Sequence, residues 1–340
     1  MLQENTRMIR IPVKEMQDRF TGILIKEGFT NEKAEQCAAV FANNSLDGVS
    51  SHGINRFLRF IEYIRNKYIN IHAEPTLQNK LGNIEQWNGN LGPGILNAIH
   101  ATKIAMNLAN ENGIGCVTLN NTNHWMRGGA YGWQVAKAGY VFIGWTNTIA
   151  NMPAWGAKDA RLGNNPLVMA MPYKDEAIVL DMAMSQYSFG AMEFAVIQNK
   201  ELAVQGGFDE QGILTNDPAA ILKSRRPLPV GYWKGTGLAL LLDLLATVLS
   251  GGLATHEISK KEIECGLSQV FIAFDISKFG SRSVIASMVE NIINDYHQSV
   301  LSDATNKIMY PGERVLEARK NNLANGILVM SQVWDEILNF

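Results

Sequence analysis

The chain contains few cysteines and has no strong excess of charge of either sign. Its three cysteines are far apart in 340 residues, and an odd, scattered set is typical of reduced thiols, not of an extracellular disulfide framework. We interpret Cys37, Cys116 and Cys265 as small buried apolar residues. Lysine plus arginine total 30 against 32 for aspartate plus glutamate, a formal net charge of -2. Without an overall positive field we expect no nucleic-acid or membrane partner, and a small molecule is the expected ligand.

The sequence also lacks a recognisable targeting signal and a long uninterrupted apolar run. Residues 1–5 contain no basic region followed by an apolar core, so we expect no secretory signal and a cytoplasmic protein. The most apolar segment, residues 238–249, is interrupted by Asp243 and Thr247 and is too short to cross a bilayer. We interpret this segment as a buried helix. With 46% hydrophobic and 18% charged residues, the chain is expected to fold into two or three lobes.

Several common catalytic motifs are missing. Residues 113–115 (GIG) precede a strand instead of following one, and residues 235–237 (GTG) lack a third glycine at the required spacing. This argues against a conventional Rossmann fold. The chain has no P-loop, no G-x-S-x-G elbow and no H-E-x-x-H motif. Its other histidines, at positions 72, 100, 256 and 297, show no ligand spacing, so we expect no metal.

Hydrophobic periodicity instead predicts alternating helices and strands. Helices are expected as a hairpin within residues 13–47 and over residues 95–109, 129–138, 236–249, 284–296 and 313–322. Strands are expected over residues 115–119, 140–145, 166–171, 177–182 and 269–274. The pattern indicates an α/β fold with a mixed sheet, because residues 166–182 read as an antiparallel hairpin. Trp334 and Ile337 are expected to anchor the chain end in a core.

The most informative segment is residues 51–56 (SHGINR), which follows the predicted helical hairpin. An imidazolium at His52 could give a proton to a carbonyl oxygen, while the Arg56 guanidinium could hold a carboxylate through two hydrogen bonds. Such a pair suits reduction of a keto acid. Taken alone, however, a histidine near an arginine is more often a structural hydrogen-bonded pair than a catalytic one.

Polar residues follow two of the predicted strands, at residues 120–124 and 146–148, where α/β proteins commonly present ligand-binding groups. Residues 123–129 (NHWMRGG) could orient a polyhydroxylated substrate, although a capped helix start with a packing tryptophan is the commoner explanation. Residues 231–237 (GYWKGTG) precede the apolar helix and could seat a phosphate or carboxylate. A glycine-rich helix entry with a solvated lysine explains them equally well.

Five segments together resemble the type 2 malate/L-lactate dehydrogenase family, in one order and over nearly the whole chain. They are residues 51–57 (SHGINRF), 123–129 (NHWMRGG), 163–166 (GNNP), 179–182 (VLDM) and 231–235 (GYWKG). Within that family the sequence is most similar to the NADH-dependent 2,3-diketo-L-gulonate reductases, through HWMRGG, residues 131–133 (YGW) and residues 206–209 (GGFD).

The resemblance implies the family's mixed-sheet, non-Rossmann α/β fold with N-terminal helices. It also implies that 2,3-diketo-L-gulonate is reduced to 3-keto-L-gulonate by hydride from NADH, or alternatively NADPH, with His52 as proton donor. Arg56 is expected to hold the substrate carboxylate, and His124, Thr146 and Asn147 to bind substrate oxygens. The implied cofactor-binding residues are Glu176, Ala177, Ile178, Val179, Leu180, Asp181, Met182, Trp233, Lys234, Gly312, Glu313 and Arg314. Glu313 and Arg314 depart from the residues typical of those reductases, so backbone contacts are expected there.

Two alternatives stay open at this point. The substrate could be a simpler 2-keto or 2-hydroxy acid of the malate, lactate or ureidoglycolate type, or the chain could be a noncatalytic binding protein on the same fold. We expect a helical region over residues 1–75 that carries His52 and packs with residues 310–340, and an α/β cofactor- and substrate-binding region over residues 76–309. The resemblance also implies a homodimer.

Overall fold

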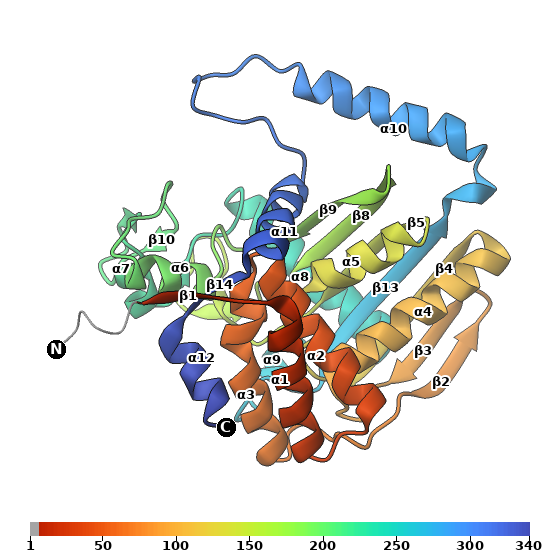
Figure 1. Ribbon diagram of the computed structural model, residues 1–340, viewed down its shortest axis with the longest axis horizontal. Coiled ribbons are helices and arrows are strands. Elements are labelled where there is room, and N and C mark those ends of the chain that lie inside the picture. The colour runs from red at the N-terminus through yellow and green to blue at the C-terminus, as the bar shows by residue number, and fades with distance from the viewer. Residues whose placement is uncertain (1–6) are drawn as a thin grey trace.

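The computed structural model describes residues 7–340, and its centre is a mixed sheet of seven strands in the order β2-β3-β4-β13-β5-β8-β9 (Figure 1). β3 and β4 are parallel, and the other neighbouring pairs are antiparallel. The strands are β2 (Thr76–Leu81), β3 (Ile84–Asn88), β4 (Ile114–Thr122), β5 (Tyr140–Thr146), β8 (Leu167–Tyr173), β9 (Glu176–Met182) and β13 (Leu267–Asp275). The predicted mixed α/β fold is thereby confirmed, and the predicted hairpin is the edge pair β8 and β9. Residues 1–5, on which the expectation about secretion rests, lie outside the described residues.

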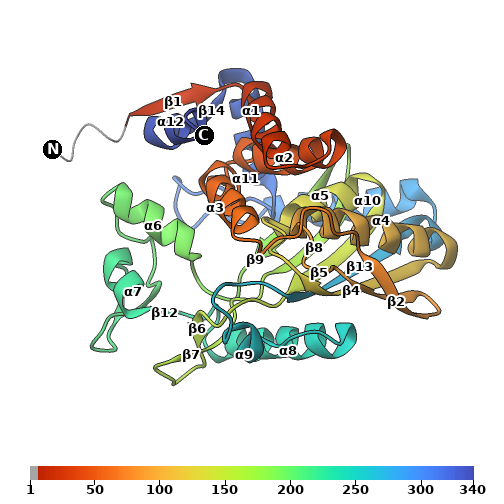
Figure 2. The ribbon, with the colours of Figure 1, turned by 90° about the horizontal axis from the view of Figure 1, so that it is seen from below.

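One face of the sheet is covered by α4 (Gly94–Asn112) and α5 (Gly128–Lys137), which contact β4, β5, β8 and β9 (Figure 2). Their alanine-rich inner sides allow close packing. A Cβ at Gly115 on β4 would lie 2.2 Å from the Ala105 carbonyl oxygen of α4, so this approach requires glycine. Trp125 and Phe271 pack edge to face in the same core, with ring centroids 5.7 Å apart. The core on this face supports the loops between β4 and α5.

The N-terminal helices form a second core on the same side of the sheet. α1 (Val13–Lys26), α2 (Asn31–Leu46) and α3 (Ile54–Arg65) enclose a cluster of phenylalanines, and the rings of Phe20 and Phe57 stack 4.0 Å apart. Thr30 caps α2 by accepting a hydrogen bond from the Lys33 N–H. The chain end closes this core through β1 (Met8–Ile11), its antiparallel partner β14 (Ile327–Met330) and α12 (Ser331–Leu338). Trp334 and Ile337 are buried there, as predicted.

The opposite face of the sheet is covered by α8 (Trp233–Ser250), which lies below the sheet in Figure 2. Its inner side, with Ala239, Leu242 and Ala246, packs against β5 and β13. The outer side is exposed and apolar: Leu241 is 56% and Val248 72% exposed. The prediction of a buried helix was therefore wrong, because an apolar composition does not tell which sides have a partner in the same chain. By length and composition alone α8 could cross a membrane, and 33% of it is buried.

The predicted bounds of α8 also need correction. The helix begins at Trp233, so residues 235–237 belong to its first turns and do not precede it. Gly235 is required there, because a Cβ would lie 2.2 Å from the Val230 carbonyl oxygen. Cys37 is buried as predicted, while Cys116 and Cys265 are only half-buried, and all three are free thiols.

The remaining elements surround the sheet. Their bounds are η1 (Ser50–His52), β6 (Met152–Pro153), β7 (Ala160–Leu162), α6 (Phe189–Ile197), β10 (Gly207–Phe208), β11 (Leu214–Thr215), α7 (Pro218–Ser224), β12 (Arg226–Pro227), α9 (Thr255–Ile258), η2 (Ile276–Lys278), α10 (Arg282–His297) and α11 (Glu313–Asn325). Figure 1 shows α10 at the margin of the molecule, joined to α11 by a long connection. α11 instead lies against α2, and its residue Asn322 is buried there.

Candidate active site

The candidate site lies at one edge of the sheet, where several strands end. β4, β5 and β9 run in the same direction because one antiparallel strand separates each from the next. Their carboxyl ends therefore meet at one edge, together with the start of β13. The predicted polar segments that follow β4 and end β5 are both placed there. His52 comes to this edge from the N-terminal helices, on the side that carries α4 and α5.

The backbone around His52 is fixed by side chains of α2. Asn44 donates a hydrogen bond from Nδ2 to the His52 carbonyl oxygen at 2.9 Å, and Ser45 Oγ accepts the Ile54 N–H at 2.9 Å. A Cβ at Gly53 would lie 2.2 Å from Ser45 Oγ, so only glycine allows this packing. These contacts explain why the sequence His-Gly follows the helical hairpin. They fix the backbone of His52 and thereby the position from which its imidazole projects.

The structure brings His52 and His124 together, although they are distant in sequence. Their rings are nearly parallel, with centroids 5.8 Å apart. His124 Nδ1 lies 2.9 Å from the Met126 backbone nitrogen and accepts its hydrogen, so the neutral ring carries its proton on Nε2. His52 Nδ1 lies 3.1 Å from Ser51 Oγ. The pair therefore presents two imidazoles whose orientations are set by neighbouring polar groups.

Burial dominates the proton affinity of both rings. It lowers the pKa of His52 to about 4; the charge of Asp181 opposes this effect, while Arg56 and Arg127 add to it. Burial, with smaller contributions from Arg56 and His52, also lowers the pKa of His124 well below its usual value. Both histidines are consequently neutral near pH 7 in the ligand-free protein.

Arg56 lies beside His124, and the contact of both residues with substrate stays a prediction. The two side chains line a small cleft together with Arg59, Phe60, Tyr63, Ile69, Asn123 and Met126. Burial lowers the pKa of the Arg56 guanidinium, and the charge of Glu264 opposes this effect. The Glu264 carboxylate accepts the Ile149 N–H at 3.0 Å, and burial raises its pKa. The cleft thus combines a cation for an acid group with the imidazole of His124, and the ring of His52 stacks on that of His124.

Thr146 and Asn147 are at the same edge, but their side chains are engaged within the protein. Asn147 Nδ2 donates to Asp243 at 2.9 Å and to the Leu253 carbonyl oxygen at 2.7 Å, while its Oδ1 accepts the Ser268 N–H at 2.8 Å. Thr146 Oγ1 donates to the Asn147 carbonyl oxygen at 2.9 Å. Both side chains are buried. They fix the loop that ends β5, and their direct contact with substrate stays a prediction.

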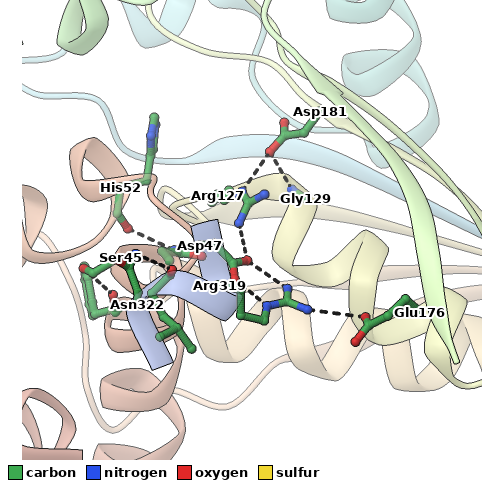
Figure 3. A network of polar contacts seen from close by, with 12 residues as sticks. Ser45, Asp47, His52, Arg127, Gly129, Glu176, Asp181, Arg319 and Asn322 are labelled. Atoms are coloured by element: carbon green, nitrogen blue, oxygen red, sulfur yellow. Dashed lines mark hydrogen bonds and ion pairs between the residues drawn. The ribbon is translucent and has the colours of Figure 1, made fainter. Parts of the chain in front are cut away.

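A buried ionic network lies behind His52 (Figure 3). Asp47, at the end of α2, accepts hydrogen bonds from Arg127 Nη1 at 2.6 Å and from Arg319 Nε at 2.7 Å. Arg127 Nε also lies 3.6 Å from Asp181 Oδ2, which accepts the Gly129 N–H at 2.8 Å. The network joins α2, the start of α5, β9 and α11. Sequence reasoning missed Asp47 and Arg319, because no local pattern links them to the His52 motif.

Two of the predicted cofactor segments meet in the structure. The Val179 N–H on β9 donates to the Pro311 carbonyl oxygen at 2.9 Å. Gly312 has a φ of 99°, which favours glycine, and its missing Cβ would lie 3.2 Å from the Trp133 ring. Glu176, at the start of β9, pairs with Lys137 at 3.2 Å and with Arg319 at 3.4 Å.

The other predicted cofactor residues have varied positions. Glu313 Oε2 accepts the Tyr310 N–H at 3.0 Å, so this side chain closes its own turn, whereas Arg314 is exposed. Trp233 and Lys234 are exposed in the first turn of α8, on the sheet face opposite α4 and α5. Ala177 is buried on β9. On the same strand, Ile178, Leu180 and Met182 are half-buried.

One further observation is compatible with a nicotinamide cofactor near Gly312. Trp133 Nε1 is buried and has no hydrogen-bond partner within residues 7–340, beside the position that a Gly312 side chain would fill. This leaves a buried donor without a partner next to the start of α11, where backbone N–H groups favour negatively charged groups. Across the same part of the chain, no group of three or more His, Cys, Asp or Glu residues is arranged for a metal ion.

Comparison with known proteins places these features in a family. The malate/L-lactate dehydrogenase family model matches residues 11–338. The chain is 41% identical to the 2,3-diketo-L-gulonate reductases of Citrobacter koseri and Klebsiella pneumoniae, over 97% of this chain and 99% of each relative. Malate dehydrogenase from Entamoeba histolytica has a TM-score of 0.92 at 22% identity, covering 98% and 97% of the two chains. For malate dehydrogenase from Pyrococcus horikoshii the TM-score is 0.88 at 26% identity, with 99% and 95% covered. The chain therefore belongs to the malate/L-lactate dehydrogenase family and is an oxidoreductase of hydroxy or keto acids.

Proposed function

We propose that the protein reduces 2,3-diketo-L-gulonate to 3-keto-L-gulonate with NADH, and that His52 donates the proton. The observation that carries this proposal is the cluster of His52, His124 and Arg56 at the strand-end edge. It combines the groups that a keto acid requires: a cation for the carboxylate and imidazoles for carbonyl oxygens. The similarity to relatives named 2,3-diketo-L-gulonate reductase supports the choice of substrate.

The cofactor would be held by β9 and by the start of α11, with Gly312, Trp133 and the backbone near Val179 as its surroundings. When bound, the reduced nicotinamide supplies the hydride that is added to the substrate carbonyl carbon. The resemblance favours NADH, and NADPH is the alternative. Trp233 and Lys234 are proposed to contact the cofactor from the first turn of α8, and their exposure leaves them accessible.

The proton must come from an imidazole that is neutral before substrate binds. Burial, and to a smaller extent the charge of Arg56, lowers the pKa of His52 in the free enzyme, and a substrate carboxylate bound to Arg56 would cancel the repulsion from that charge. Asp181 already raises the pKa of the same ring. We therefore infer that His52 takes up a proton together with the anionic substrate and then gives it to the developing alkoxide. General acid catalysis of this kind accelerates a reaction by about 10²–10⁴-fold.

His124 would act beside it as a hydrogen-bond donor. Because its Nδ1 accepts the Met126 N–H, its Nε2–H is directed away from that bond and is free for a substrate oxygen. Thr146 and Asn147 would contribute through the loop that they hold at the end of β5. Together these groups fix which face of the ketone receives the hydride.

We also propose that the protein acts as a homodimer in the cytoplasm. The apolar outer side of α8 supports the dimer, because an exposed apolar face of this kind is costly in water unless a partner covers it. α10 carries a second exposed apolar row, with Val284, Met288 and Ile292 at four-residue spacing. The balanced charge and the free thiols are consistent with a reducing, intracellular compartment.

The experiment is a panel of keto acids assayed with NADH and with NADPH. Loss of NADH absorbance with 2,3-diketo-L-gulonate, but little with pyruvate or oxaloacetate, supports the proposal. The reverse preference favours a simpler 2-keto acid, which is the second candidate because structural neighbours include malate dehydrogenases. An enzyme that oxidises neither cofactor with any keto acid would instead be a binding protein on this fold.

A further inference from the structure

Gln269 is a buried glutamine whose side chain has no partner. It lies near the start of β13 and is 0% exposed. Neither its Nε2 nor its Oε1 forms a hydrogen bond with any atom of residues 7–340. An amide without partners in a protein interior costs free energy, so buried amides are nearly always satisfied by protein, water or a ligand. Gln269 therefore requires an explanation.

Gln269 lies at the edge that carries the candidate site. In the sheet register it is opposite Leu119 on β4 and Thr146 on β5. It projects to the same face as Phe271, two residues further along β13, whose ring packs against Trp125 beside His124. Gln269 thus stands closer to the strand ends than Phe271, on the face where His52 and His124 gather.

Neighbouring amides show that this part of the fold normally satisfies such groups. Asn147 uses both of its amide atoms, and so does Asn165, which accepts the Thr148 N–H at 3.0 Å and donates to the Ala239 carbonyl oxygen at 2.8 Å. A second unpartnered acceptor is Asn123 Oδ1, which is buried in a residue that lines the cleft with His124 and Arg56. Asn123 Nδ2 does donate, to the Leu91 and Gly92 carbonyl oxygens. Gln269 differs from these residues because both of its amide atoms are without a partner.

We propose that Gln269 is a substrate-binding residue that selects keto acids with a hydroxyl group next to a carbonyl. This inference rests on the proposed function and deepens it. A glutamine amide offers one donor and one acceptor side by side. Its N–H donates to a keto oxygen while its carbonyl oxygen accepts the hydrogen of the adjacent hydroxyl. In 2,3-diketo-L-gulonate the C3 keto group and the C4 hydroxyl form such a pair, whereas pyruvate has none. Asn123 Oδ1 is placed to accept a hydroxyl further along the same substrate.

The test compares Gln269→Met with the wild-type enzyme. Methionine has a similar length and shape but lacks the amide, and it leaves no buried polar group unsatisfied. We expect kcat/KM for 2,3-diketo-L-gulonate to fall by about 10- to 100-fold, because a substrate hydroxyl loses its partner. The inhibition constant of pyruvate as a competing acid should change by less than about twofold. The thermal midpoint should stay equal or rise, which a purely structural hydrogen-bonding role would not allow.

Gln86→Met is the matched control. Gln86 also lies in the sheet, but its Nε2 donates to the Leu249 carbonyl oxygen at 2.7 Å, away from the site. This variant should lose stability and keep its activity toward both acids. Should Gln269→Met fail to fold, Gln269→Asn keeps the amide and withdraws it by one methylene, with the same expected loss on diketogulonate.

The outcomes separate the two proposals. Equal changes for diketogulonate and pyruvate, or no change for either, would overturn the role of Gln269 while leaving the reductase function standing. A wild-type enzyme that leaves diketogulonate unreduced overturns both. A selective loss on diketogulonate with an unchanged or raised thermal midpoint supports the assignment of Gln269 to the substrate.

Discussion

His52 shows how surroundings set the chemistry of a single residue. Its backbone segment is held by Asn44 and Ser45, and its ring nitrogen Nδ1 lies beside Ser51 Oγ. Burial lowers its pKa to about 4 despite the opposing charge of Asp181. A histidine with an unshifted pKa would be protonated to a greater extent near neutral pH. Burial accounts for most of this low value, and an anionic substrate that neutralises Arg56 would remove the added repulsion and favour protonation of the ring. Protonation of His52 is then coupled to substrate binding, and the buried ring stays neutral when no substrate is bound.

The low pKa of His52 predicts the pH dependence of the reaction. For ketone reduction, kcat/KM reports the free enzyme and requires protonated His52, so it should fall about tenfold per pH unit from about pH 5 to pH 8. For alcohol oxidation the neutral ring is required, so the contribution of His52 should rise through pH 4 and then stay constant. Initial rates in both directions with NADH or NAD would measure this. A reduction profile that is flat up to pH 6 and declines only above it would contradict the assigned pKa.

Replacement of His52 provides the control for that profile. His52→Gln removes the acid and keeps a polar side chain of similar size. We expect kcat to fall by about 10²–10⁴-fold and the steep pH dependence to disappear, while the dissociation constant of NADH stays close to that of the wild type. Near-normal turnover in this variant would remove His52 from the proton-donating role.

Asp47 illustrates a residue that acts through others. Its carboxylate is shared by Arg127 and Arg319, and it is buried together with Arg127. Asp47→Asn leaves Arg127 and Arg319 with only their longer ion pairs to Asp181 and Glu176. We therefore expect the free energy of unfolding to fall by about 3–5 kcal/mol. Urea denaturation would measure this loss. Asp18→Asn, which removes an exposed partner of Lys14, should change stability by less than about 1 kcal/mol. Equal effects of the two substitutions would show that the buried network does not hold the fold together.

Among the secondary-structure elements, helices and strands with regular apolar spacing could be predicted from the sequence. The elements against which they pack could not. The strands β4, β5, β8, β9 and β13 and the helical hairpin of α1 and α2 follow the expected pattern closely, whereas α3 is a helix that the sequence reasoning did not predict. α8 was correctly predicted as a helix, but its burial was predicted wrongly. A helix that is apolar on every side has no hydrophobic periodicity that would identify its exposed face. Its outer side can be judged only when the sheet and the other helices are in place.

The contact between β9 and α11 allows a prediction at this scale. Gly312→Ala puts a Cβ 3.1 Å from the Val179 nitrogen and 3.2 Å from the Trp133 ring, at a φ of 99°. We expect a loss of about 1–2 kcal/mol in stability from the backbone conformation and weaker NADH binding, because the two cofactor segments are pushed apart. Fluorescence titration with NADH would measure the affinity.

Gly113→Ala is the matched control for this change. Gly113 ends α4 with a φ of 83°, and an added Cβ would meet nothing closer than 4.0 Å. It should lose comparable stability and bind NADH normally. If both alanine variants bound NADH as tightly as the wild type, Gly312 would have no special place at the cofactor.

In the molecule as a whole, the site is assembled from segments that only folding brings together. His52, Arg56 and His124 could be selected from the sequence because each occurs in a motif with suitable chemistry. Asp47, Glu264, Gln269 and Arg319 could not, because they stand in no motif and their roles depend on neighbours that are distant in the chain. Local patterns thus indicate which chemistry is available, while long-range packing determines the surrounding charges and free hydrogen-bonding groups.

The proposed homodimer is the remaining consequence at this scale. Leu241, Leu245 and Val248 form one exposed row on α8, at spacings of four and three residues, and the opposite side of the helix packs on the sheet. A second copy is the partner that would cover this row in an otherwise compact protein. Leu241→Lys combined with Val248→Lys places two charges in that contact. We expect these changes to convert a dimer to a monomer in size-exclusion chromatography with light scattering, with the fold retained by circular dichroism.

Ile25→Lys is the control for this test, because Ile25 is 43% exposed on α1 and belongs to a different surface. It adds a charge of the same sign and should leave the dimer intact. If the α8 variant also loses activity while its circular dichroism is unchanged, the second subunit completes or stabilises the site at the strand ends. An α8 variant that stays dimeric would show that α8 is not the contact between subunits, and the exposed row on α10 would then be the surface to alter. A wild-type protein that is monomeric at all concentrations would contradict the homodimer itself.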